Sequence, residues 1–252
     1  MIMKRLVLGD MHGLFNIIED IYNVEKPDSV IILGDYFDSF TIDPIIQNLG
    51  FRDLLELRKL HIETHWNNKN TFILLLGNHD FHYLTSVNER YSGYNNQTAI
   101  FASEYVHRCI DKEDMQMIYI DDVNKTIYSH AGITNKWLKE RCNNAKLGMV
   151  NTLGFEYFTF TYKNGGNSYG SSIWNGPLWV RPEGLYMDPY RDENGIYWNQ
   201  IFGHTHRKEP TYKTFYGADF YNLDCLPYYY MIEELDDQTY KLINRKIVKV
   251  DI

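Results

Sequence analysis

Residues 2–13 read IMKRLVLGDMHG, an apolar run that ends in Gly, Asp and His. The same order returns in SVIILGD (residues 29–35) and in TFILLLGNHD (residues 71–80). Short, continuously apolar runs that stop at glycine are typical of strands buried on both faces. The three stretches therefore predict neighbouring strands of a buried, largely parallel sheet.

The segments between these runs carry helical patterns. Residues 14–24 place apolar side chains at helical spacing, and residues 51–65 read as an amphipathic helix. Strand and helix in alternation predict an α/β fold with right-handed crossovers. Ligands bind at the carboxyl ends of the strands in such sheets, which is where each run places its polar residues.

Later parts of the chain repeat the step from strand to polar loop. KTIYSHAG (residues 125–132) and IFGHTH (residues 201–206) both show it, and a helix is expected around 97–110. Residues 145–198 show little periodicity, and a long irregular segment is often functional. The tail alternates in three β-like runs, 212–216, 228–234 and 239–249. Because no linker or repeat interrupts the chain, we expect one domain over residues 1–252.

Composition limits the class of protein. Hydrophobic residues make up 44% and charged residues 23%, which is ordinary for a soluble globular protein. The net charge of −8 repels polyanions and argues against long nucleic acid as a partner. Cys109, Cys142 and Cys225 form no CxxC pair, and no stretch reaches transmembrane length. We therefore expect a cytoplasmic protein with no membrane partner.

Five fragments concentrate the residues that could hold a metal ion. They are GDMHG (9–13), GDYFDS (34–39), GNHD (77–80), SHAG (129–132) and GHTH (203–206). Five of the nine histidines lie in them, so they are the richest source of imidazole in the chain. Imidazole and carboxylate together suit divalent Zn, Mn or Fe. None of the fragments contains cysteine, which argues against a structural zinc site.

In this order the fragments resemble the signature of the calcineurin-like metallophosphoesterase superfamily, over residues 9–206. The resemblance implies two facing mixed β-sheets flanked by helices. It also implies two divalent metal ions, with Mn²⁺ expected and Fe or Zn as alternatives, and a metal-bridging hydroxide that attacks a phosphate ester. The chain is most similar to the branch of bacterial and phage serine/threonine protein phosphatases.

The resemblance assigns metal ligands residue by residue. The ligands that it implies for the first ion are Asp10, His12 and His206. The carboxylate of Asp35 would bridge both ions. The ligands that it implies for the second ion are Asn78, His130 and His204.

Residues beside these ligands receive other roles from the resemblance. His79 matches a histidine that protonates the leaving group or steadies the transition state. Asp80 would orient His79 through a hydrogen bond, as carboxylates near metal sites often do. Asp38 would support the metal site from behind the ligands or stabilise a turn.

The chain departs from that branch in its second motif. Ser39 and Phe40 stand where the branch has an arginine that holds the substrate phosphate and the residue after it. The stretch GPLWVRPE (176–183) resembles the branch's LWxR stretch, which makes Arg181 a candidate phosphate contact, because a guanidinium grips two phosphate oxygens at once. Alternatively, Arg181 packs on a neighbouring aromatic side chain. A weaker substitute for the missing arginine is Arg52.

Other aromatic and histidine residues allow two interpretations. Five aromatic side chains would wall a substrate cleft or pack in the core: Trp174, Trp179, Tyr186, Tyr190 and Trp198. His61 and His65 lie one helical turn apart, and we expect them on the solvent face of their helix.

These features predict a phosphomonoesterase that acts on a phosphoprotein or on a small phosphorylated compound. One alternative is a dinucleoside polyphosphate hydrolase, a phosphodiesterase or a nuclease. Another is a catalytically silent scaffold on the same fold. The complete ligand set and His79 argue against the scaffold, and the acidic charge argues against a nuclease on long DNA.

Overall fold

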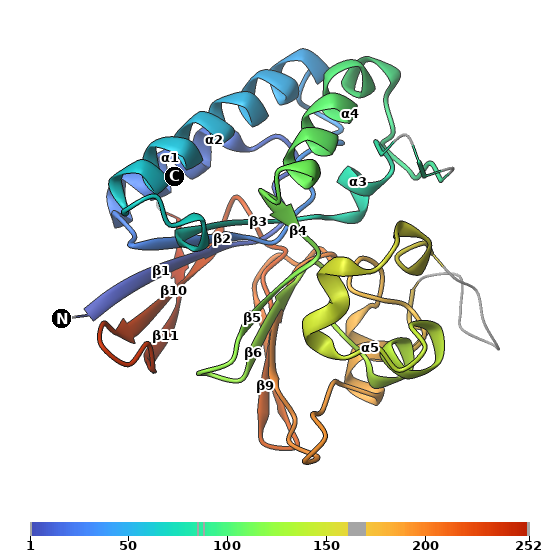
Figure 1. Cartoon of the computed structure of the whole chain (residues 1–252). Helices are drawn as coiled ribbons and strands as arrows, with labels where there is room; N and C mark the ends of the chain where they lie inside the picture. The colour runs from blue at the N-terminus through green and yellow to red at the C-terminus, as the bar shows by residue number, and fades with distance from the viewer. Residues whose placement is uncertain (1, 85, 88, 161–169, 251–252) are drawn as a thin grey trace.

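The computed structural model describes residues 2–84, 86–87, 89–160 and 170–250. Its strands form two sheets, with the helices on their outer sides (Figure 1). The first sheet has the order β11-β10-β1-β2-β3-β4 and the second has the order β5-β6-β7-β9-β8. This is the predicted α/β architecture of two mixed sheets flanked by helices.

The first sheet is parallel from β1 to β4, as predicted, and antiparallel where β10 and β11 are added. Its strands are β1 (Ile2–Leu8), β2 (Ser29–Ile32), β3 (Phe72–Leu75), β4 (Met115–Gln116), β10 (Tyr229–Asp236) and β11 (Leu242–Lys249). The second sheet consists of β5 (Ile118–Asp121), β6 (Thr126–Ser129), β7 (Asn199–Phe202), β8 (Thr211–Phe215) and β9 (Ala218–Asn222).

Apolar side chains of the central strands point to both faces of the first sheet. Leu6 and Leu8 of β1 pack in the cluster that includes the helices, whereas Val7 packs in the cluster shared with the second sheet. Ile31 of β2 and Ile201 of β7 belong to this shared cluster, so the two sheets face each other across it. Each central strand therefore buries both of its faces.

The helices cover the outer faces. Those on the first sheet are α1 (Phe15–Glu25), α2 (Pro44–Thr64) and α4 (Asn96–Asp111). The second sheet packs its outer face on α5 (Pro182–Met187). The shorter helices are η1 (Lys69–Thr71), α3 (Asn78–Phe81), η2 (Trp137–Arg141), η3 (Leu147–Thr152) and η4 (Phe155–Tyr157). In the described ranges no helix has the length and apolar character needed to cross a membrane.

Several elements differ from the sequence expectations, among them α2 and β9. Helix α2 begins at Pro44 rather than near residue 51, because the Asp43 side chain accepts the Ile45 N–H at 2.8 Å and Pro44 suits the first helical turn. Strand β9 was not predicted. It forms a hairpin with β8, with Gly217 in the turn at a positive φ of 78°, and it also pairs in parallel with β7.

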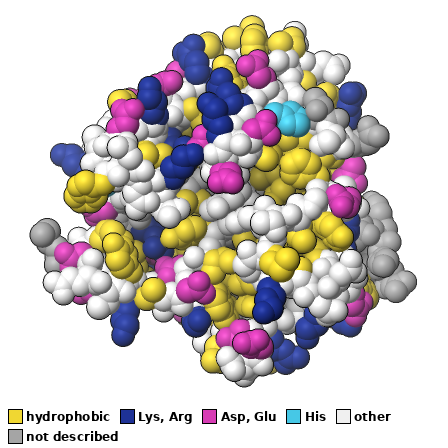
Figure 2. Space-filling model, in the orientation of Figure 1, with side chains coloured by type: hydrophobic (Ala, Val, Ile, Leu, Met, Phe, Trp, Pro, Cys, Tyr) yellow, Lys and Arg dark blue, Asp and Glu magenta, His cyan; other side chains and the backbone are white. Residues whose placement is uncertain are grey.

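The surface carries charges of both signs. On the face in Figure 2, Lys and Arg side chains stand among Asp and Glu side chains, with hydrophobic patches between them. Such mixing is ordinary for a soluble domain and offers no continuous basic surface on this face.

Candidate metal centre

The predicted metal-binding fragments all follow strand ends. The loops after β1, β2 and β3 of the first sheet meet the loops after β6 and β7 of the second. Ligand atoms of Asp10, Asp35 and His130 lie within 4.8 Å of one another. The two facing sheets thus place acidic and imidazole groups from distant parts of the chain in one buried cluster.

Asp35 lies at the middle of this cluster. Its Oδ2 atom is 3.4 Å from Nε2 of His130 and 3.7 Å from Nε2 of His12. Its Oδ1 atom accepts the backbone N–H of His79 at 2.9 Å. Burial alone would raise the pKa of Asp35, but the positive potential of His130, His79 and His12 holds that pKa below its ordinary value. Asp35 is therefore an ionised carboxylate between two imidazoles.

Both imidazoles turn a lone pair toward Asp35. Nδ1 of His12 lies 2.8 Å from the carbonyl oxygen of Phe37, and Nδ1 of His130 lies 3.0 Å from that of Leu33. A carbonyl oxygen can only accept, so each Nδ1 carries a proton, and in the neutral form of imidazole that binds metal the lone pair is on Nε2. A lone pair that faces a carboxylate is satisfied by a cation, so the donor set fits divalent metal ions.

Asn78 joins the histidines of the second sheet. Its Oδ1 atom is 2.8 Å from Nε2 of His130 and 2.9 Å from Nδ1 of His204. Burial is the main reason that the pKa of His204 lies well below its ordinary value, and the charges of His130 and Arg181 lower it further. The three predicted ligands of the second ion thus lie together.

Asp10 is held by the loop that carries His204. Both of its carboxylate oxygens accept the His204 N–H, at 3.1 and 2.9 Å. A Cβ atom at Gly203 would lie 1.9 Å from Oδ1 of Asp10, so only glycine permits this approach. Burial and the negative charges of Asp224 and Asp35 raise the pKa of Asp10 well above its ordinary value. Bound cations would reverse that effect.

Backbone strain gathers at the same place. Four residues of the predicted motifs have left-handed backbone conformations, with positive φ angles: His12 at 41°, Asp35 at 52°, Asp38 at 66° and His204 at 64°. Non-glycine residues seldom adopt this region, and such strain is often retained at functional sites.

His206 is more exposed than the other predicted ligands. Its side chain is 69% exposed, and its Nδ1 atom is 3.3 Å from Oδ1 of Asp224. Sequence reasoning did not select Asp224. The stretch FYNLDC does show a β-type run followed by an aspartate, but it lacks the glycine that marks the five fragments.

The partner of His79 differs from the prediction. Nδ1 of His79 donates to Oδ2 of Asp38 at 2.8 Å, so Asp38 rather than Asp80 orients the ring. The two oxygens of Asp80 instead accept the backbone N–H groups of Asp35, Tyr36 and Gly77, at 2.8, 2.8 and 2.9 Å. The expectation for Asp80 was wrong because these nearby backbone donors occupy its carboxylate.

Asp38 is surrounded by hydrogen-bond donors. Besides His79, the Nε2 atom of His82 lies 2.7 Å from its Oδ2, and the hydroxyl of Tyr83 donates to its Oδ1. Nδ1 of His82 accepts the backbone N–H of Tyr91, so Nε2 of His82 carries the proton. This cluster is therefore a hydrogen-bonded support for His79 rather than a set of open metal ligands.

The charge state of His79 follows from its neighbours. Burial by itself lowers the pKa of His79, but the negative Asp35 and the hydrogen bond to Asp38 outweigh it and raise that pKa to about 9. The ring of His79 also lies edge-on to that of His12, with centroids 5.3 Å apart. His79 therefore lies beside the cluster with surroundings that favour the protonated form of its ring.

Arg181 approaches the site from the irregular segment. Its charge acts on His204, and its buried Nε atom has no hydrogen-bond partner among the described residues. The ring of Trp179 lies 6.0 Å from that of His204, centroid to centroid. Arg52, in contrast, donates to Asp53 on the exposed face of α2. Among the described residues, Arg181 thus has a donor without a partner and acts on the cluster through its charge, whereas Arg52 is paired with Asp53.

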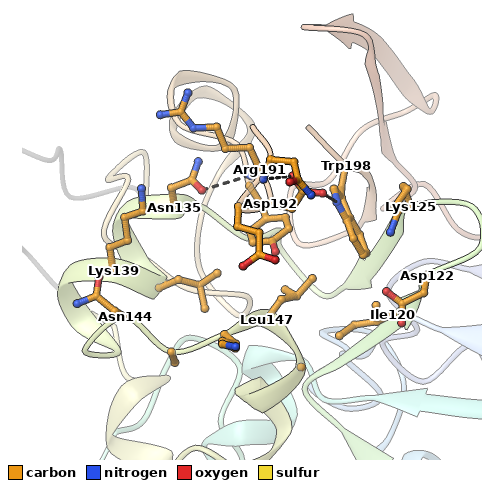
Figure 3. A pocket seen from close by; sticks show the side chains of 17 residues that line it. Ile120, Asp122, Lys125, Asn135, Lys139, Asn144, Leu147, Arg191, Asp192 and Trp198 are labelled. Carbon is orange, nitrogen blue, oxygen red and sulfur yellow. Dashed lines mark hydrogen bonds between the residues drawn. The ribbon is translucent and has the colours of Figure 1, made fainter. Parts of the chain in front are cut away.

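A separate cavity of about 530 Å³ lies at the other ends of β6 and β7. Figure 3 shows Lys125 and Trp198 on one side of it and Lys139 and Asn144 on the other. Lys125 immediately precedes β6 and Trp198 immediately precedes β7, whereas His130 and His204 follow these strands. Trp198 and Tyr190, which also lines the cavity, therefore do not wall the metal centre.

A family model described as calcineurin-like phosphoesterase matches residues 3–208. No curated protein matches the chain significantly. Among solved structures, the chain is similar to a cold-active protein-tyrosine phosphatase of the psychrophile Shewanella sp., with 15% identity, 97% of this chain and 80% of that chain covered, and a TM-score of 0.58.

It is also similar to a protein serine/threonine phosphatase from Saccharomyces cerevisiae, with 13% identity, 98% and 80% of the two chains covered, and a TM-score of 0.56. At such identities the two structures support the fold alone.

Proposed function

This chain belongs to the calcineurin-like phosphoesterase family of metal-dependent hydrolases, and from that premise we propose that it hydrolyses phosphate monoesters at the Asp35 cluster. The observation that supports this most directly is Asp35 itself, an ionised carboxylate that faces the lone pairs of His12 and His130. Asp10, His12, Asp35 and His206 would hold one ion, and Asp35, Asn78, His130 and His204 the other. We propose Mn²⁺ as the metal.

Two bound divalent ions would supply a water-derived nucleophile at neutral pH and neutralise the phosphate oxygens. The chain itself supplies the proton and the positioning. His79, oriented by Asp38, would donate a proton to the leaving oxygen. Arg181 would grip the phosphate, because its Nε atom is buried beside His204 without a partner among the described residues.

A monoester suits this arrangement better than a diester. A terminal phosphate carries nearly two negative charges at neutral pH, and a diester carries only one. The extra charge is matched by Arg181 together with two cations. A diester must also fit a second organic group. The missing arginine at Ser39 leaves one cation fewer, which is why diesters and anhydrides belong in the test.

The experiment compares the chain on an aryl monoester, an aryl diester, a phosphopeptide and a dinucleoside polyphosphate, with Mn²⁺ present. We expect the highest kcat/KM on a monoester. A higher kcat/KM on the diester or on the polyphosphate would mean that the protein is a nucleotidyl hydrolase and not a phosphatase.

A matched pair of variants tests the metal centre. Asp35→Asn should lose most metal and most activity, because the residue serves both ions. Asp53→Asn, an exposed aspartate on α2, should lose neither. Full metal content and activity in Asp35→Asn would refute the assignment.

A further inference from the structure

The loop after β9 lies directly against the loop after β1. A Cβ atom at Gly9 would come within 2.0 Å of the Leu223 carbonyl oxygen and 3.3 Å of the Asp224 Cα. Only glycine allows two backbones to approach so closely. Asp224 is thereby brought beside Asp10, the next residue after Gly9, and the two carboxyl groups are in contact.

The same loop is tied to the loop that carries His206. The buried side chain of Asn222 accepts the Asp224 N–H at 3.0 Å and donates to the Thr205 carbonyl at 2.8 Å. The Arg207 N–H donates to the Asp224 carbonyl at 2.9 Å. These bonds engage the residues on both sides of His206, so the position of Asp224 relative to His206 is fixed by the backbone.

The carboxylate of Asp224 is in place to select one form of the His206 ring. Oδ1 of Asp224 lies 3.3 Å from Nδ1 of His206. A carboxylate can only accept, so Nδ1 carries the proton and the lone pair is on Nε2. His12 and His130 have carbonyl oxygens at the same ring position, those of Phe37 and Leu33. Each of these three predicted histidine ligands thus has an acceptor at Nδ1.

We propose that Asp224 is a positioning residue of the metal centre, which anchors the exposed His206 through Nδ1 and turns Nε2 toward the ion that Asp10 and His12 hold. The proposal rests on the proposed function, because it needs His206 as a ligand. A histidine that binds metal commonly donates its other N–H to such an acceptor. Loss of the acceptor typically lowers the affinity for the metal by about 10–100-fold. Loss of the Asp224 carboxylate would therefore lower the affinity for one ion and leave the affinity for the other unchanged.

The experiment is a calorimetric titration of the chelator-treated full chain with Mn²⁺. Wild type should bind two ions, and Asp224→Asn should bind one of them about 10–100-fold more weakly. Asp219→Asn is the matched control, since Asp219 lies on β9 and bonds only to Tyr212 and Thr214 among its described side-chain partners. Circular dichroism establishes that each variant is folded.

His206→Asn supplies a second variant on an exposed side chain. It should lower the affinity for the same Mn²⁺ ion that Asp224→Asn affects. The double variant should bind that ion no more weakly than His206→Asn alone. Wild-type binding by Asp224→Asn, equal weakening of both ions, or further loss in the double variant would each overturn the proposal. Failure of the wild type to bind two ions would overturn the proposed function as well. The wild-type titration therefore distinguishes a failure of the proposed function from a failure of the Asp224 proposal alone.

Discussion

In the proposed function, His79 and Asp38 keep proton transfer apart from metal binding at the level of single residues. The ring of His79 is committed to Asp38 through Nδ1, and it is not needed to hold either ion. Asp38 is in turn held by His82 and Tyr83, both of which follow α3 closely. The predicted acid therefore has its own support, distinct from the carboxylate of Asp35.

His79→Asn should retain both metal ions and lose about 10²–10⁴-fold in kcat, the usual range for general acid catalysis. The loss should be smaller for a nitrophenyl ester, because nitrophenolate leaves without a proton. Metal analysis and kcat on alkyl and nitrophenyl phosphates measure the two effects. An equal loss on both esters would mean that His79 stabilises charge in the transition state instead.

Arg181→Ala should lower kcat/KM for monoesters by about 10-fold or more, since a hydrogen bond to a charged group contributes about 1.5–3 kcal/mol. The KM for monoesters should rise, and diester turnover should fall less. Arg52→Ala is the control, because Arg52 is paired with Asp53 on the exposed face of α2. Equal effects of the two substitutions would exclude Arg181 as a phosphate contact.

At the scale of elements, the strand ends depend on glycines that admit a neighbouring carboxylate. Gly203, at the end of β7, leaves room for Asp10. Gly77, at the end of β3, leaves room for Asp35, whose Oδ1 would lie 2.1 Å from a Cβ atom there. Gly203 and Gly77 thus set how closely two loops approach at these strand ends.

Gly203→Ala should displace Asp10, weaken metal binding and destabilise the protein by about 1–3 kcal/mol, the usual cost of overpacking. Gly148→Ala in η3 is the control, since no other heavy atom lies within 4 Å of its added Cβ, and it should change stability by less than about 0.5 kcal/mol. Urea denaturation and Mn²⁺ titration measure both. Unchanged metal affinity in Gly203→Ala would contradict the role of this close approach.

The end of α2 differs from the sequence expectation. His61 was expected on the solvent face with His65, but it is buried against Tyr22 and Phe72. His65 stacks on it, with ring centroids 4.0 Å apart. Burial, and then the charge of His65, lower the pKa of His61 to about 4. The expectation failed because β3 packs beneath the last turn of the helix.

His61 should make the protein less stable in mild acid. The unfolded chain has an ordinary histidine pKa of about 6.5 and binds a proton more readily than the folded state. This contribution to stability is complete above pH 6.5 and is lost as the pH falls toward 4. Urea denaturation of the chelated protein at pH 7 and 5 should show a larger loss for wild type than for His61→Gln. Between pH 8 and pH 7, wild type and His61→Gln should lose equal amounts of stability.

At the scale of the whole molecule, a buried network of charges joins the two sheets. Arg5 of β1 bonds to Asp121 of β5 at 2.9 Å and to Glu233 of β10 at 3.1 Å. Tyr128 of β6 donates to Glu233 at 2.6 Å, and Arg245 of β11 pairs with it at 2.7 Å. The network fixes how the two sheets face each other (Figure 1). Because each sheet carries part of the candidate metal centre, the network also fixes how these two parts lie relative to each other.

Glu233→Gln should destabilise the protein by about 3–5 kcal/mol, because it leaves two buried guanidinium groups short of a counter-charge. Glu234→Gln, the next residue on β10, should cost less than about 1 kcal/mol, since Glu234 pairs with the exposed Lys246. Urea denaturation compares them. Similar costs for both would mean that the network contributes no more than a surface ion pair.

The sequence by itself determined the central strands β1, β2 and β3 of the first sheet and the loops that carry the motifs. An apolar run, a glycine and a polar residue are adjacent in the chain, so the pattern can be read locally. Parallel strands end at one edge, which is why Asp10, Asp35 and Asn78 could be expected together. Their role as ligands remains a prediction, although the structure brings them together.

Only the tertiary structure decided which neighbours these residues have. His79 could bond to Asp80 or to Asp38, and the folded backbone settles this by offering Asp80 three N–H groups. Asp224 reaches Asp10 and His206 through β9, a strand defined by its pairing with β7. Such partners come from segments distant in sequence, and their hydrogen bonds and burial exist only once the two sheets have packed.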